Sequence, residues 1–91
     1  MRRRERRLFA ITDGITRLRA TLDEVLAELG VLRHLQDDAV RDAVVGGPVE
    51  REDAREGGRD VARFEKLATD LAGQIEKLEE KRLRLMDQIA E

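Results

Sequence analysis

Apolar side chains recur along most of this chain in alternating steps of three and four residues. Such steps average about 3.5 residues, the period at which one face of a helix meets a neighbouring helix. The pattern stops at Gly46-Gly47-Pro48 and then resumes. The first run is Leu8, Ile11, Ile15, Leu18, Leu22, Val25, Leu29 and Leu32, and the second is Val61, Phe64, Ala68, Leu71, Ile75, Leu78, Leu85 and Ile89. We therefore predict an all-α fold, an antiparallel two-helix coiled-coil hairpin.

Two registers are open for pairing these runs. The register with the tighter turn pairs Ile15 with Leu78. The other pairs Val25 with Ile75 and needs a longer tip, so we prefer the tight turn. Gln36, Ala39 and Ala43 continue the first run with smaller or polar side chains, and Arg82 stands in the second run where an apolar residue is expected. An unpaired buried charge is costly, so we expect Arg82 to reach outward or to meet a carboxylate.

The predicted organisation has four segments. Residues 1–7 form a basic N-terminal arm, 8–45 the first helix, 46–58 a glycine-bracketed acidic tip with the start of the second helix, and 59–91 the second helix. Gly46 or Gly47 is expected to take the left-handed conformation that ends a helix, and Pro48 suits a first helical turn. Gly57-Gly58 leaves a second possible start open, near Arg59, but the pattern favours Pro48.

Composition favours long solvated helices over a compact globule, because 42% of the 91 residues are charged and only 2% are aromatic. Two helices provide a thin core, for which oligomerisation is a common remedy. The chain has no cysteine and hence no disulfide or thiolate metal site. It also has no apolar run near the ~20 residues that cross a bilayer. The arginines of residues 2–7 are not followed by an adequate signal-peptide core. We expect a cytoplasmic protein.

Both predicted helices carry apolar residues beside the main pattern. A two-helix contact needs one row of residues, and a wider apolar stripe is typical of a helix with more than one neighbour. Leu26 and Val40 lie on one flank of the first helix and Leu35 on the other, while Leu67 and Met86 flank the second row. We predict that these five residues form an interface, most simply in a homodimer whose hairpins pair into a four-helix bundle. A different protein partner is the alternative.

The densest basic run precedes the first apolar run. Residues 1–7 hold five arginines and one glutamate, whereas residues 36–60 hold eight acids against four arginines. A hairpin therefore has a basic end and an acidic end. The basic end suits phosphates or another anionic surface, which makes nucleic-acid binding an alternative function. No aromatic residue lies there to stack on a base. The candidate anion contacts are Arg2, Arg3, Arg4, Arg6 and Arg7.

Residues that carry catalysis or hold cofactors form no recognisable motif. The only histidine, His34, falls on the outer face of the first helix, and a Glu-x-x-His metal pair would need a glutamate where Val31 stands. No phosphate-binding loop, nucleophile elbow or His-Glu-x-x-His string occurs. We predict that the protein is not an enzyme and has no cofactor and no metal site.

Gly47-Pro48-Val49, followed by Asp53, Arg55 and Glu56, resembles the segment after the first helix of the all-helical chorismate mutases. That family carries a catalytic lysine on its first helix, and residues 8–45 contain no lysine. It also has two helices where residues 61–91 form one pattern. The resemblance therefore does not extend to the activity.

Ile11-Thr12-Asp13-Gly14, followed by Leu18 and Leu22, resembles the opening of the coiled-coil hairpin of bacterial transcript-cleavage factors. Residues 75–81 resemble its closing helix. That hairpin enters the secondary channel of RNA polymerase and presents acidic tip residues to a magnesium ion. The tip here is acidic but lacks the family's Asp-Leu-Ser-Glu-Asn-Ala-Glu type of string, and the second globular domain has no counterpart. The resemblance implies a polymerase-channel binder as a further alternative.

The favoured function is a non-enzymatic helical-hairpin module for protein–protein interaction or oligomerisation. Contact of the basic end with nucleic acid or an anionic surface, and binding in the polymerase channel, are the alternatives.

Overall fold

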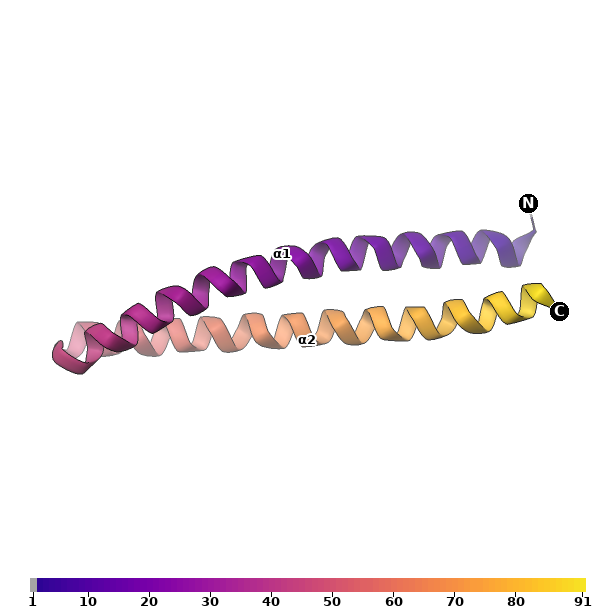
Figure 1. Cartoon of the computed structure of the whole chain (residues 1–91). Coiled ribbons are helices and arrows are strands. Elements are labelled where there is room, and N and C mark those ends of the chain that lie inside the picture. The colour runs from indigo at the N-terminus through magenta and orange to yellow at the C-terminus, as the bar shows by residue number, and fades with distance from the viewer. Residues whose placement is uncertain (1) are drawn as a thin grey trace. The chain divides into compact units, whose positions relative to one another are not determined.

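The computed structural model describes residues 2–91 and contains two helices, α1 (Arg3–Val45) and α2 (Pro48–Ala90). Gly46 and Gly47 join them, and α2 returns antiparallel to α1 (Figure 1). Residues 2–91 contain no strand. The predicted all-α antiparallel hairpin is confirmed, and its packing is coiled-coil-like. We call the two apolar runs, which face each other between the helices, the row.

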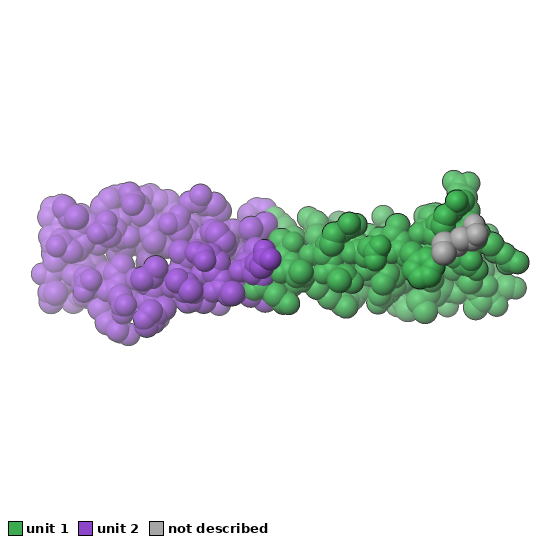
Figure 2. Space-filling model, turned by 90° about the horizontal axis from the view of Figure 1, so that it is seen from above, with its two compact units in different colours: residues 1–23, 69–91 green, residues 24–68 purple. Residues whose placement is uncertain are grey.

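Contacts between the helices divide the hairpin into two compact units (Figure 2). Unit 1 joins residues 1–23 to residues 69–91, and unit 2 consists of residues 24–68. Each unit contains part of α1 and part of α2, and unit 2 also contains the turn. Each therefore has its own interior.

Unit 1 has the better filled interior. Ile15 is only 1% exposed, and Leu71, Ile75 and Leu85 are also buried. A fully buried side chain of this size contributes roughly 1.5–3 kcal/mol. The predicted row therefore stabilises unit 1 almost throughout, although Ile89, in the last turn of α2, is exposed. Half-buried members of the row surround the core: Leu8, Ile11, Leu18, Leu22 and Leu78.

Unit 2 has a thinner interior. Val25 and Leu29 are the buried apolar residues of 24–68. The row continues toward the turn as predicted, but its side chains there are smaller or polar, so less apolar area leaves water. The half-buried members of the row in unit 2 are Leu32, Gln36, Ala39, Ala43, Val61, Phe64 and Ala68.

α2 begins at Pro48, the start that the sequence analysis favoured over Arg59. Proline suits this position because the first N–H groups of a helix have no intrahelical partner. The Glu50 carboxylate accepts a hydrogen bond of 2.8 Å from the N–H of Gly47. This is the backward half of a capping box, in which a side chain three residues into the helix satisfies the N–H of the capping residue. α2 then continues through Gly57-Gly58 without a break.

Gly46 serves the turn through its size and not through its backbone angles. No glycine in residues 2–91 has a positive φ, so the expectation of a left-handed Gly46 or Gly47 is wrong. A Cβ atom on Gly46 would lie 2.6 Å from Glu50 Cγ and 2.7 Å from the Asp42 carbonyl oxygen. Both separations are too short for carbon. Glycine is needed because the first turn of α2 approaches the end of α1 closely.

Contacts inside each unit match the register with the tighter turn. In unit 1 a Cβ on Gly14 would lie 3.5 Å from Leu78 Cδ1, so Leu78 lies against α1 one residue from Ile15, its expected partner. In unit 2 the side chain of Gln36 lies against Gly57, the position with which the same register pairs it.

Candidate interaction surfaces

The arginines of the basic end lie in unit 1 and are exposed. α1 begins at Arg3, so this segment is helical from there. It lies beside the last turns of α2, where Arg4 Nη1 donates a hydrogen bond of 3.3 Å to the carbonyl oxygen of Gln88. Within residues 2–91 no ion pair involves a guanidinium of this group. Their charges are therefore open to an external anion. The group is Arg2, Arg3, Arg4, Arg6 and Arg7.

The five predicted interface residues are all partly exposed, from 43% for Leu67 to 57% for Leu35. The heptad divides them between the two flanks of the row. Arg19 and Glu79 form an ion pair between the helices of unit 1, so their heptad positions are neighbours. Leu26 and Val40 share the heptad position of Arg19, and Met86 shares that of Glu79. We call the heptad positions of Leu26, Val40 and Met86, taken within each unit, the apolar side.

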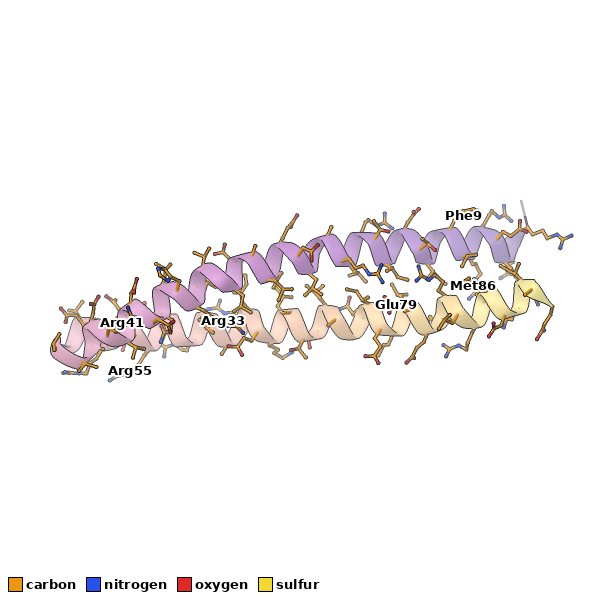
Figure 3. All side chains as sticks on the ribbon, in the orientation of Figure 1. Phe9, Arg33, Arg41, Arg55, Glu79 and Met86 are labelled. Carbon is orange, nitrogen blue, oxygen red and sulfur yellow. The ribbon has the colours of Figure 1, made fainter. Side chains whose placement is uncertain are left out.

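Two residues that the sequence analysis missed, Phe9 and Leu83, enlarge the apolar side. They are 57% and 63% exposed. In unit 1 they line one hollow with Met86. Figure 3 labels Phe9 on α1 and Met86 on α2. Their heptad positions lie one step further from the row than those of the five predicted interface residues. A prediction limited to the positions next to the row therefore does not include them. The sequence did indicate them in one respect, because each is a large apolar residue outside the row.

Arg82 occupies a position of the row in α2 and is half-buried. It lines the same hollow as Leu8 and Met86. Within residues 2–91 no carboxylate forms an ion pair with it. Of the two expected arrangements, the ion pair is therefore absent, and a half-buried stem with an outward guanidinium fits the observed burial.

On the other flank of the row, hollows within each unit are lined by charges of one sign. In unit 2, Leu35 lines a hollow with Asp53, Glu56 and Asp60 and with no basic residue. In unit 1, two hollows are lined by basic residues and by no acidic residue. Leu67 shares the heptad position of Asp60. The basic lining residues are Arg7, Lys77, Lys81 and Arg84. We call this the charged side.

Gln36 makes a polar contact inside unit 2. Its Nε2 donates a hydrogen bond of 2.8 Å to the carbonyl oxygen of Ala54, while its buried Oε1 has no hydrogen-bond partner. The Oε1 atom lies where a Cβ on Gly57 would be. Glycine therefore allows the amide to reach the backbone of α2. A single polar residue in a helical row favours one register, because other registers leave it unpaired.

The groups that carry most enzyme chemistry are dispersed over the exposed surface. His34 Nε2 lies 3.8 Å from an Asp38 carboxylate oxygen one turn away, and both side chains are largely in solvent. In the described part of the chain no three His, Asp or Glu side chains are arranged to hold a metal ion. The described residues thus offer exposed flanks and a basic end for contact.

Neither helix has an apolar stretch long enough to span a membrane, as judged over residues 2–91. Comparisons of the chain with protein-family models, with curated proteins and with solved structures find no match.

Proposed function

We propose that this protein is a non-enzymatic interaction module whose hairpin self-associates, forming a homodimer with a four-helix bundle. One observation carries the proposal. The side chains of the row pack between α1 and α2 of the same chain. Beside the row, five apolar side chains remain 43–57% exposed: Leu26, Leu35, Val40, Leu67 and Met86.

Association gains from these residues because roughly half of each side chain is still in water. Full burial of a large apolar side chain contributes roughly 1.5–3 kcal/mol, and two-fold symmetry counts each contribution twice. The loss of translational and rotational freedom costs about 4–15 kcal/mol. A few flank residues per chain, together with Phe9 and Leu83 on the apolar side, are thus enough to offset much of that cost.

Sedimentation equilibrium at micromolar concentration tests the proposal. A mass near twice the 10.4 kDa of the chain is expected. Two variants locate the contact: Leu26→Glu with Val40→Glu on the apolar side, and Leu35→Glu with Leu67→Glu on the charged side. A wild-type mass near 10.4 kDa at every concentration overturns self-association.

A second candidate function is contact with nucleic acid or another anionic surface through the basic end. The observation that favours it is the set of five arginine side chains without an ion pair in residues 2–91. Phosphate contacts weaken steeply as salt concentration rises, whereas an apolar interface responds little. Changing all five arginines to alanine should remove retention on duplex DNA at low salt and leave the mass unchanged. If the wild type is not retained at low salt, this candidate is withdrawn.

A further inference from the structure

One flank of unit 1 combines basic residues from both helices. It consists of the two heptad positions on each helix that border the basic hollows, taken over residues 3–21 of α1 and 74–88 of α2, and none of these positions holds an acid. Asp70 and Glu91 occupy the same heptad positions just beyond the two ends of the α2 segment. Six residues of the flank are basic and exposed, and we call these six the basic flank: Arg3, Arg7, Arg17, Lys77, Lys81 and Arg84.

The basic residues of α2 lie where α1 has none. Between Arg7 and Arg17, α1 has no basic residue on this flank. In the observed register, Arg84, Lys81 and Lys77 lie beside this gap. The hollows agree, because Arg7 lines one of them together with Lys81 and Arg84. The basic flank is therefore one continuous line of charge that draws on α1 and α2 in turn.

The charges of the basic flank are available to another molecule. Within residues 2–91 no ion pair involves any of its six residues. One heptad step further out, unit 1 carries Asp13, Glu80 and Asp87, and none of these forms an ion pair with the flank. Residues 3–17 of a helix span about 21 Å, so the line suits an extended polyanion better than a single small anion.

We propose that the basic flank binds the phosphate backbone of duplex nucleic acid. The proposal rests on the second candidate function and adds a surface on α2 to the arginines of the basic end. A duplex carries about one negative charge per 1.7 Å of its axis, so a line of this length runs beside roughly a dozen phosphates.

Other anionic partners fit this flank less well. Binding at a membrane surface needs large apolar side chains among the basic ones, and those of unit 1 lie on the apolar side instead: Phe9, Leu83 and Met86. Single strands bind by stacking their bases on aromatic side chains, and the flank has none. Gln74 and Gln88 are exposed among the basic residues of α2, where their amides can donate hydrogen bonds to phosphate oxygens.

Such contacts predict binding that depends on salt and not on base sequence. Phosphate contacts fix the position of a protein on a duplex but carry no sequence information. Two duplexes of unrelated sequence should therefore bind with equal affinity. Six phosphate contacts predict a slope of about −5 for the logarithm of the binding constant against the logarithm of the salt concentration.

Removal of the α2 charges tests the surface without touching the five arginines of the basic end. The variant is Lys77→Gln with Lys81→Gln and Arg84→Gln, all at exposed positions. Its affinity for a fluorescently labelled duplex at about 50 mM salt should fall at least about 100-fold, and its salt slope should shrink by about 3. Fluorescence anisotropy measures both quantities, and circular dichroism shows whether the variant keeps its helicity.

Two controls isolate position and charge. Arg33→Gln with Arg41→Gln and Arg55→Gln changes the net charge equally at exposed positions of unit 2 (Figure 3), and it should bind with near wild-type affinity. The second control keeps every charge of the basic flank and changes the side chains that carry it: Lys77→Arg, Lys81→Arg and Arg84→Lys. It should also bind like the wild type, because a phosphate contact requires the charge and not one particular side chain.

The outcomes separate this inference from the proposed functions. Wild-type affinity in the α2 variant overturns the inference, while the second candidate function stands if substitution of the five arginines still removes retention. A wild type that does not bind duplex at low salt removes both, and self-association is judged separately from the sedimentation mass. The α2 variant should keep the wild-type mass. A fall in its mass assigns these residues to the contact between copies and overturns the inference.

Two further results would also overturn it. Affinities that differ by more than about tenfold between the unrelated duplexes indicate recognition of bases. Binding to vesicles that contain phosphatidylserine, without binding to duplex, assigns the basic flank to a lipid surface.

Discussion

Units 1 and 2 follow the same heptad pattern but fill it differently. Unit 1 buries Ile15, Leu71, Ile75 and Leu85, whereas unit 2 buries only Val25 and Leu29. Near the turn the row passes to Gln36 and to alanines, and the contact between helices depends on glycine and on one amide hydrogen bond. The period of the apolar residues determines which face of each helix is buried. The volume of the side chains on that face determines how much their burial stabilises the unit.

The largest expected effect is the loss of a core side chain in unit 1. Ile15→Ala should reduce the free energy of unfolding by about 2–4 kcal/mol, because a cavity remains where the side chain was almost completely buried. The comparison in unit 2 is Leu32→Ala near the turn, where the side chain is only half-buried, and it should cost about half as much. Urea unfolding followed by circular dichroism at one protein concentration measures both. Equal costs would mean that the two interiors are equally well packed.

The next effect concerns the close approach at the turn. Gly46→Ala should destabilise by about 1–3 kcal/mol, since the new Cβ meets the Asp42 carbonyl oxygen and the Glu50 stem, neither of which can move freely. Gly14→Ala in unit 1 meets only Leu78 at ordinary contact distance. It should stabilise by up to ~1 kcal/mol through helix propensity. A neutral or stabilising Gly46→Ala would contradict the view that space, and not φ, requires glycine there.

A smaller difference separates two helical glycines of α2. Gly73 in unit 1 has open space around a Cβ, so Gly73→Ala should gain about 1 kcal/mol. Gly57→Ala in unit 2 should change stability little, because the same gain is offset by displacing Gln36 from its hydrogen bond to Ala54. In a Gln36→Ala background, Gly57→Ala should recover the full gain. Thermal unfolding of this double-mutant cycle decides whether the two residues are coupled.

The smallest effect is that of the ion pair between the helices in unit 1. Arg19→Ala should cost at most about 1 kcal/mol, and the cost should shrink in high salt, since the Arg19 side chain is 55% exposed. Thermal melts at low and high salt measure it. A larger, salt-independent loss would show that Arg19 stabilises through packing of its stem.

Most of the fold could be predicted from the chain alone. Two apolar rows at the helical period and a Gly-Gly-Pro interruption are enough for two helices, a turn and the buried face, and the half-buried or buried rows confirm that face from Leu8 to Leu85. The start of α2 at Pro48 also agreed with expectation. Local chemistry determines these features, because each depends on residues within a few positions of one another.

Several details depend on residues that are distant in the sequence. Gly57 is needed at its position only because Gln36, on the other helix, lies against it. The exposure of Phe9 and Leu83 in one hollow, and the separation of basic from acidic hollows, likewise require both helices to be in place.

The sequence by itself determined the two helices, their buried face and the place of the turn, because periodicity records the direction of each side chain around its own helix. Only the tertiary structure decided which side chains meet across the pair, that Gly46 is required for space and not for a left-handed backbone, and which charges share a hollow. These features follow from the register and from side-chain size at each contact, and no single helix contains that information.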